Sequence, residues 1–229
     1  KIQECGVVGL GGATFPTNVK LSPPPGKKAE FLIINAAECE PYLTSDNRVI
    51  LEHTEEVLIG IEIMKKALNI NKAKIGIEAN KPKAIEALKK LVSQYPGTEV
   101  VALKTKYPQG AEKQLIYALT KREVPSGKLP IEVGCVVNNI GTAFAIYQAV
   151  QKNRPLIDNV LTYTGKKAEI NKNLLVRVGT SIQSIIDFCG GLPEDTGKVI
   201  NGGPMMGKAM MDLTAPTTKT TSSILVMSE

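Results

Sequence analysis

The feature that most constrains the fold is an alternation of short apolar segments with longer segments of helical periodicity, running through the first two thirds of the chain. Apolar, strand-like segments are expected at residues 31–35, 73–79, 98–103 and 133–137, and helices at residues 45–69, 80–92, 111–119 and 141–150. Strands that alternate with helices are typical of an α/β fold with a largely parallel sheet. Ligands of such folds bind in the loops beyond the strand ends.

A different pattern begins near residue 155. Two β-like segments, a short helix that starts at Ser181, and two further β-like segments follow one another, with the strands expected at residues 160–164, 174–178, 198–201 and 224–227. This order predicts a small α+β domain. We therefore expect two domains, residues 1–154 and residues 155–229, and a hydrophobic content of 43% is enough to give both a core.

A glycine-rich segment near the start of the chain is the most informative motif, and it reads Gly9-Leu10-Gly11-Gly12-Ala13-Thr14-Phe15-Pro16-Thr17-Asn18-Val19-Lys20. Glycines let a backbone approach a flat ring or a phosphate closely. The segment is not a dinucleotide fingerprint, because Thr14 stands where G-x-G-x-x-G has its third glycine. A tight turn is the alternative. Pro16 can begin a short helix that places the charge of Lys20 about one turn along.

Three further polar segments follow expected strands, and each could line a ligand cleft. Their polar or glycine residues are Asn35, Glu38 and Glu40 after the first strand, Tyr107, Gly110 and Glu112 after the third, and Asn138, Asn139 and Thr142 after the fourth. Backbone N–H groups near Gly110 can meet an anion where a helix opens. The alternatives are ordinary surface carboxylates, a capped helix start and an Asn-Asn turn.

These four segments, in this order, resemble the flavin-bearing NADH dehydrogenase subunit of respiratory complex I. They resemble more closely the C subunit of the Rnf ion-translocating electron-transport complexes, as does the turn Gly202-Gly203-Pro204-Met205-Met206-Gly207. The resemblance spans nearly the whole chain. It implies a Rossmann-like FMN- and NADH-binding domain with a mostly parallel sheet, followed by a small β-grasp domain of the ubiquitin-like, soluble-ligand-binding kind.

The resemblance also implies which residues contact the two cofactors. They are Gly9, Gly11, Gly12, Ala13, Phe15, Lys20, Asn35, Glu38, Glu40, Tyr107, Gly110, Glu112, Asn138, Asn139 and Thr142. Phe15 is expected to stack on the adenine, whereas the second stacking residue of the family is missing, with Pro23 near its place, so we expect weaker adenine packing. Hydride transfer needs no side chain as acid or base, so Lys20, Glu40 and Glu112 are expected to position the cofactors. Ala37 and Ala111 stand where the complex I relative carries acids.

The implied activity is hydride exchange between NADH (or NAD) and FMN, in a flavoprotein subunit of the NADH dehydrogenase or ferredoxin:NAD oxidoreductase type. The implied partners are the other Rnf subunits, both membrane-embedded and iron–sulfur, which would hold this subunit peripherally on the cytoplasmic side of the membrane. We expect the chain to be a fragment, with [4Fe–4S] clusters only in a further C-terminal domain. The alternatives are a cobalamin reductase of the same superfamily, a scaffold subunit that has lost its flavin, and a soluble-ligand or glycan-binding module centred on residues 155–229.

Composition argues against several other classes. Four scattered cysteines and one histidine favour neither a disulfide scaffold nor a metal site built by the protein. No segment approaches the roughly 18–20 continuous apolar residues of a membrane-spanning helix. The net charge of +6 is spread along the chain and aromatic residues make up 4%, so nucleic acid is not an expected partner.

Overall fold

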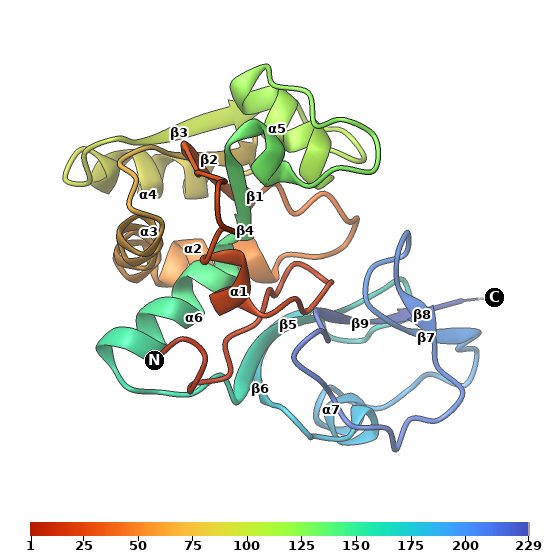
Figure 1. Cartoon of the computed structure of the whole chain (residues 1–229). Helices are drawn as coiled ribbons and strands as arrows, with labels where there is room; N and C mark the ends of the chain where they lie inside the picture. The colour runs from red at the N-terminus through yellow and green to blue at the C-terminus, as the bar shows by residue number, and fades with distance from the viewer. Residues whose placement is uncertain (229) are drawn as a thin grey trace. The chain divides into compact units, whose positions relative to one another are not determined.

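The computed structural model describes residues 1–228, which form two compact units. The first unit consists of residues 1–39 and 49–156, and the second of residues 40–48 together with residues 157 onward. Each unit has its own sheet (Figure 1). In residues 1–228, no helix combines the length and the apolar character that crossing a lipid bilayer requires.

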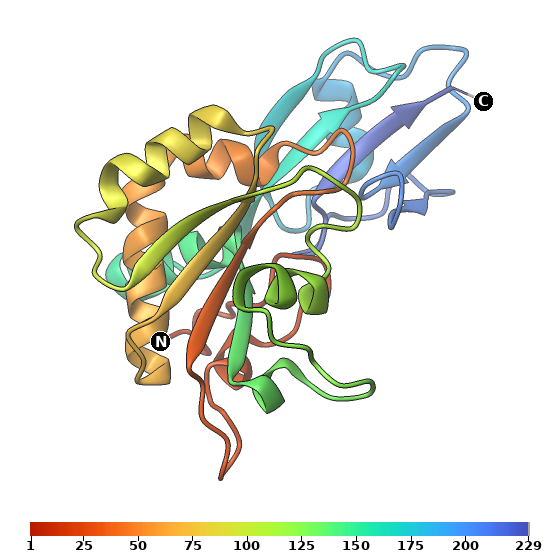
Figure 2. The same cartoon turned by 90° about the horizontal axis from the view of Figure 1, so that it is seen from above.

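The sheet of the first unit has four strands, β1 (Phe31–Ala36), β2 (Ala73–Glu78), β3 (Thr98–Leu103) and β4 (Cys135–Asn139). Their spatial order is β3-β2-β1-β4, and every neighbouring pair is parallel (Figure 2). The prediction of a parallel α/β sheet is therefore confirmed. Because all four strands run in one direction, their carboxyl ends share one edge of the sheet.

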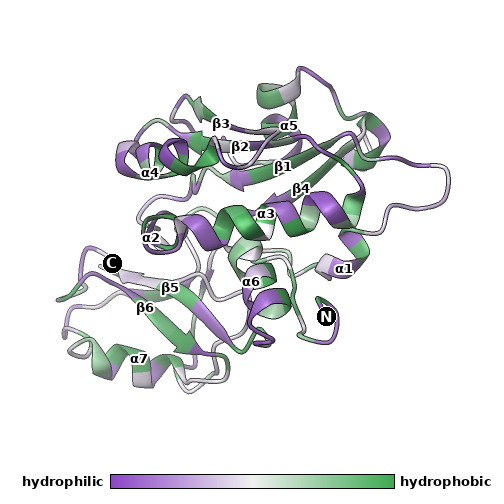
Figure 3. Ribbon diagram, turned by 90° about the vertical axis from the view of Figure 1, so that its left-hand side faces the viewer, coloured by the Kyte–Doolittle hydropathy of each residue, from purple (hydrophilic) through white to green (hydrophobic). Residues whose placement is uncertain are grey.

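Helices cover both faces of this sheet. The helices between residues 17 and 151 are α1 (Thr17–Lys20), α2 (Ser45–Glu52), α3 (Thr54–Leu68), α4 (Pro82–Val92), α5 (Glu112–Thr120) and α6 (Ile140–Gln151), with a 3-10 turn η1 (Pro130–Val133). Helix α5 packs Leu115 and Ile116 against Ile33 and Val137 on one face, whereas α3 and α4 lie on the other side (Figure 1). Hydrophobic and hydrophilic residues alternate along α3, as expected for a helix with one buried face (Figure 3).

Two details of the expected helices were wrong. The single helix expected over residues 45–69 is two helices, because His53 has a non-helical backbone (φ −133°) and stacks its ring on Phe144, with ring centroids 4.3 Å apart. The helix expected over residues 80–92 begins at Pro82, with Lys81 at its N-cap position, and the Lys81 side chain makes no capping bond. A tertiary contact accompanies each boundary: His53 stacks on Phe144, and Lys81 Nζ donates to the Ala37 carbonyl.

The second unit is a small mixed sheet with one helix. Its elements are β5 (Asp158–Thr164), β6 (Lys172–Arg177), α7 (Ile182–Phe188), β7 (Lys198–Asn201), β8 (Lys208–Ala209) and β9 (Ser223–Met227). The strand order is β6-β5-β9-β7-β8, with β5 and β9 parallel and the other pairs antiparallel. This confirms the small α+β domain. Tyr163 is wholly buried in its core beside Ile186 and Ile224, and desolvation raises the pKa of its hydroxyl to about 12.

Helices α3 and α6 cross with their backbones in contact at Gly60. A Cβ atom on Gly60 would lie 1.9 Å from the carbonyl oxygen of Ala143, far inside any permitted contact. Only the hydrogen of glycine fits there. Gly60 therefore sets how closely α6 approaches α3.

We expect Gly60→Ala to lower the free energy of unfolding by roughly 1–3 kcal/mol, the usual cost of forcing atoms into a packed interior. Helix propensity acts in the opposite direction, because alanine in a helix is favoured over glycine by about 1 kcal/mol. Lys66→Ala, at an exposed position of the same helix, is the control and should change stability by less than about 0.5 kcal/mol. Urea titrations followed by circular dichroism measure both, and a Gly60→Ala protein as stable as the parent would contradict the close crossing.

Candidate cofactor-binding site

The pairing of β1 with β4 brings polar residues to the carboxyl edge of the first sheet. Asn35 pairs in register with Asn139, and Ile34 pairs with Asn138. Because the two strands are parallel, the segments that follow them leave the sheet at the same edge. Two of the polar segments that were singled out in the sequence therefore start side by side.

The glycine-rich loop lies against the start of α6. The Leu10 N–H donates a hydrogen bond of 2.9 Å to Thr142 Oγ1, and a Cβ on Gly11 would lie 3.3 Å from the Cβ of Asn139. The Gly9 N–H donates to the Phe15 carbonyl at 2.9 Å and closes the loop on itself. Gly12 has a φ of 111° and no atom within 4 Å of where its Cβ would stand. The loop thus presents bare backbone beside Asn139.

The start of α6 is held by Asn139 and carries an unusual buried amide. Asn139 Oδ1 caps the helix, accepting hydrogen bonds from the Gly141 N–H (2.8 Å) and the Thr142 N–H (3.3 Å). Asn138 is 4% exposed, and its Nδ2 has no hydrogen-bond partner within residues 1–228. A buried donor without a partner is costly, so it is a natural contact for an oxygen of a ligand.

The segment after β3 joins the same edge through Asn35. Asn35 Nδ2 donates to the Gly110 carbonyl at 2.9 Å, and Asn35 Oδ1 accepts from the Ala37 N–H at 3.1 Å. The Cys39 thiol accepts a hydrogen bond from the Gly110 N–H at 3.4 Å. A Cβ on Gly110 would stand 3.2–3.3 Å from the Asn35 amide and the Cys39 sulfur, so glycine permits this close approach. Tyr107 is partly exposed in the same segment.

Lys20 and Glu112, both expected to contact cofactors, form an ion pair with each other. Lys20 Nζ lies 2.9 Å from Glu112 Oε1 and joins the end of α1 to the start of α5. The two side chains remain 33% and 41% exposed. A pair this open to water is worth only about 0–1 kcal/mol. Either group can therefore turn to a charged ligand at small cost.

The remaining expected residues of the first unit are accessible. Gly11, Gly12, Ala13 and Phe15 are exposed on the glycine-rich loop. Glu38 is half-buried and has a φ of 47°, a left-handed conformation that is uncommon for a residue with a side chain. Such backbone is kept only where its surroundings hold it, and it is frequent at functional sites.

Glu40 belongs to the second unit, unlike the other expected site residues. Its carboxylate accepts hydrogen bonds from the backbone N–H groups of Met205 (3.1 Å) and Met206 (2.8 Å). A Cβ on Gly203 would lie 2.2 Å from Glu40 Oε2, so this glycine lets the turn close around the carboxylate. The expected contact between Glu40 and a nicotinamide stays a prediction.

Sequence reasoning missed Glu78 and Lys81, which form a buried ion pair between the strand ends. Neither residue lies in the four segments singled out above, and a Glu and a Lys three positions apart give no signal of burial. Their contacts become visible only when the loops after β1, β2 and β3 are placed together.

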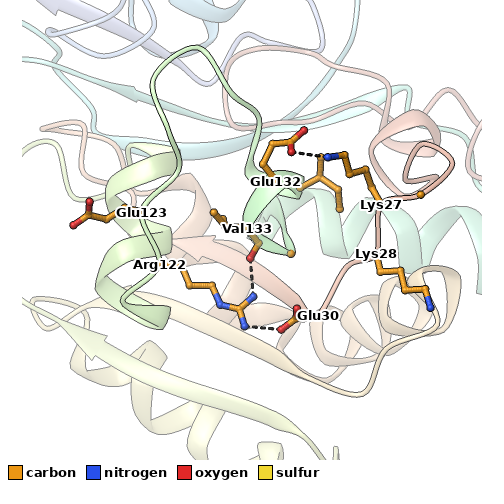
Figure 4. A pocket seen from close by; sticks show the side chains of 10 residues that line it. Lys27, Lys28, Glu30, Arg122, Glu123, Glu132 and Val133 are labelled. Atoms are coloured by element: carbon orange, nitrogen blue, oxygen red, sulfur yellow. Dashed lines mark hydrogen bonds and ion pairs between the residues drawn. The ribbon is translucent and has the colours of Figure 1, made fainter.

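An open cavity elsewhere on the first unit is not part of this site (Figure 4). It lies at the opposite edge of the sheet, where the backbone N–H of Glu30, just before β1, donates to the carbonyl of Gly134, just before β4. Its charges are balanced: the cations are Lys27, Lys28 and Arg122, and the anions are Glu30, Glu123 and Glu132. Arg122 pairs with Glu30 and Lys27 with Glu132, so these cations are already matched.

Comparison with protein families gives a match to the Nuo51 FMN-binding domain over residues 2–148. The chain is 56% identical over 226 residues to the C subunit of the proton-translocating ferredoxin:NAD(+) oxidoreductase complex of Clostridium ljungdahlii, covering 98% of this chain and 49% of the relative. It is 47% identical over 228 residues to the C subunit of the Na(+)-translocating ferredoxin:NAD(+) oxidoreductase complex of Acetobacterium woodii, covering 100% and 52%. The chain thus spans about half the length of these relatives.

A solved structure shares the fold. A chain of the NAD+-reducing [NiFe]-hydrogenase in the air-oxidized state matches with a TM-score of 0.79 at 21% sequence identity. The match covers 98% of this chain and 45% of the hydrogenase chain. At this identity the likeness bears on the fold alone, and it agrees with the expected Rossmann-like domain.

We expect Glu40→Ala to expose the backbone amides of Met205 and Met206 to hydrogen exchange, because it removes the acceptor of both N–H groups. Glu40→Gln keeps one amide oxygen as an acceptor and should retain part of the protection. Glu194→Ala, at an exposed glutamate of the same unit, is the control. Hydrogen exchange resolved to single residues measures the effect, and unchanged protection in Glu40→Ala would show that these two bonds do not persist in solution.

Proposed function

The chain belongs to the Nuo51 FMN-binding domain family, and from this premise we propose that its first unit binds FMN and NADH and supports hydride exchange between them. The resemblance to the C subunits of Rnf complexes, drawn from the sequence motifs, is confirmed by the curated relatives. The chain would act as the flavin- and nicotinamide-binding part of an ion-translocating ferredoxin:NAD oxidoreductase complex.

One observation carries the proposal. Four residues from separate segments gather at the carboxyl edge of the parallel sheet: Gly11 against Asn139, Asn139 in register with Asn35, and Asn35 bonded to Gly110. In open parallel sheets this edge is where ligands bind. Two of the four are glycines, and a Cβ on Gly11 or Gly110 would crowd the neighbouring asparagine, Asn139 or Asn35 respectively. The arrangement supports a slot for planar cofactors.

The residues present fit an FMN. Asn138 offers a buried amide donor without a partner, which suits an oxygen of the ribityl chain or the phosphate. The positive end of the α6 dipole favours a phosphate, although Asn139 already accepts from the Gly141 and Thr142 N–H groups there. Bound FMN would supply the hydride-accepting chemistry at its flavin ring. The glycine-rich loop, through Gly11 and Gly12, would let that ring lie close to the backbone.

The side chains of the chain would position the substrates rather than exchange protons with them. Lys20 and Glu112 can leave their mutual pair to meet a phosphate and a ribose hydroxyl, respectively. Phe15 is 49% exposed and available for stacking on an adenine. Holding two reacting groups in a near-attack arrangement can by itself lower a barrier by roughly 7–11 kcal/mol.

The setting of the whole protein is also a proposal. The curated relatives are named as subunits of ion-translocating complexes and are about twice as long as this chain or longer. We infer that the polypeptide beyond this chain carries [4Fe–4S] clusters that receive electrons from FMN. Other subunits of the complex would hold it peripherally on the cytoplasmic side of the membrane.

The test is to incubate the chain with FMN, remove unbound flavin, and add NADH without oxygen. We expect yellow protein whose visible flavin absorbance bleaches with NADH. Asn139→Asp is the informative variant, because aspartate keeps the α6 cap but places a negative charge beside the expected phosphate. Its affinity for FMN should fall at least about tenfold, whereas its affinity for riboflavin, which lacks the phosphate, should change little.

The stability of Asn139→Asp provides the control for that experiment. Its free energy of unfolding should stay near the parental value, whereas Asn139→Ala should lose roughly 0.5–2 kcal/mol with the cap. A parental chain that binds no flavin would favour the scaffold alternative. Equal losses of FMN and riboflavin affinity in Asn139→Asp would argue against a phosphate at the start of α6.

Phe15→Ala should raise the dissociation constant for NADH roughly two- to tenfold, the range that follows from a stacking contact worth about 0.5–1.5 kcal/mol. FMN affinity should be unaffected, because the expected partner of Phe15 is the adenine. Tyr117→Ala removes a similarly exposed aromatic ring on α5 and is the matched control. Titration of bound flavin fluorescence with an inert NADH analogue measures both, and an unchanged constant for Phe15→Ala would remove Phe15 from the site.

A further inference from the structure

A buried ion pair lies among the loops that form the candidate site. Glu78 is the last residue of β2 and is 2% exposed, and the side chain of Lys81, three residues later, is 9% exposed. Lys81 Nζ and Glu78 Oε2 are 3.6 Å apart. Charges removed from water to this extent are retained only where partners and further hydrogen bonds compensate them. The other hydrogen bonds of Glu78 and Lys81 therefore identify the backbone segments that this ion pair fixes in place.

The ammonium of Lys81 holds the backbone that follows β1. Its Nζ donates to the Ala37 carbonyl at 2.7 Å and to the Glu38 carbonyl at 3.5 Å. It also contacts Asn80 Oδ1 at 3.2 Å. The two carbonyls flank the point where the backbone takes the left-handed conformation of Glu38. A fixed cation at this place opposes any relaxation of that turn.

The carboxylate of Glu78 holds the backbone that follows β3. Its Oε1 accepts a hydrogen bond of 3.2 Å from the Lys106 N–H. The Lys106 carbonyl in turn accepts from the Gln109 N–H at 3.0 Å, so this bond anchors the turn that leads into Gly110. One ion pair thus joins the segments that follow β1, β2 and β3.

We infer that Glu78 and Lys81 are positioning residues of the proposed cofactor site, which set the backbone of residues 37–39 and 106–110 relative to each other. The role in hydride exchange rests on the function proposed above. The two segments meet again at Gly110, whose carbonyl accepts from Asn35 and whose N–H donates to the Cys39 sulfur. A shift at either end of the ion pair would therefore displace Gly110 and Asn35, which line the slot.

Cys39 gives a readout of this geometry that needs no cofactor. It is the one cysteine of the four that is not buried, and it directly follows Glu38. Burial raises the pKa of the Cys135 and Cys189 thiols, which further disfavours their alkylation. Alkylation of the native chain by iodoacetamide therefore reports on the segment 37–39.

The first arm of the experiment compares Lys81→Met with Lys83→Met, which removes an exposed lysine from the same helix. We expect several-fold faster alkylation of Cys39 in Lys81→Met and the parental rate in Lys83→Met. Lys81→Arg, which keeps a cation able to donate to both carbonyls, should recover most of the protection. Parental alkylation rates in Lys81→Met would overturn the inference.

The second arm measures NADH oxidation by the FMN-loaded chain with ferricyanide as acceptor. A misplaced site backbone should lower kcat roughly tenfold or more, because hydride exchange is sensitive to displacements of about 1 Å. A structural defect that only reduced the amount of folded protein would lower kcat per total protein but not per bound FMN. Rates are therefore expressed per bound FMN, and unchanged kcat and KM in Lys81→Met would also overturn the inference.

A double variant guards against simple unfolding. Lys81→Met leaves Glu78 as a buried charge without its cation, whereas Glu78→Gln with Lys81→Met removes both charges. The double variant should melt near the parental temperature and still show fast Cys39 alkylation and a low kcat. If it behaves as the parent in both assays, the pair does not position the loops.

If the parental chain binds no FMN, the proposed function fails, and the alkylation arm alone decides the positioning role.

Discussion

The register between β1 and β4 is the constraint on which the site depends. It places Asn35 beside Asn139 and Ile34 beside Asn138, so that the amides of two distant segments reach the same edge. Leu32, Ile33 and Ile34 are fully buried, with helices packed on both faces of the sheet. A slip of one residue would exchange the side chains presented to the two faces. The packing of the core therefore also fixes the geometry of the polar edge.

Much of the fold could be predicted because its elements carry local patterns. The strand expected at residues 98–103 is β3 itself, and the short helix expected after Pro16 is α1. The break at His53 could not be foreseen, because it accompanies a ring stack on Phe144 some ninety positions away. Strand β8 has only two residues, too few for any periodicity. Predictions failed where a contact distant in sequence sets the local conformation.

The candidate site divides in the same way. Gly11, Asn35, Gly110 and Asn139 could be singled out because each lies near the end of an apolar strand or in a glycine cluster, and the structure brings them together. Spacing in the sequence does not predict which residues meet in space. It could not show that Lys20 pairs with Glu112, or that Glu40 accepts a hydrogen bond from the Met205 N–H. Glu78 and Lys81 were missed for the same reason, because their partners lie in segments distant in sequence.

Two ion pairs of the first unit differ in burial, and this difference assigns them different tasks. Lys20 and Glu112 are one third or more exposed, so water can replace either partner and the pair can open at little cost. Glu78 and Lys81 are more than nine tenths buried, and separating them would leave an uncompensated charge in the interior. A charged dinucleotide that bound at this edge would therefore contact the exposed Lys20–Glu112 pair, which can open. The buried Glu78–Lys81 pair among the loops would stay closed. Under the proposed function, binding would rearrange Lys20 and Glu112 while the backbone held by Glu78 and Lys81 stays in place.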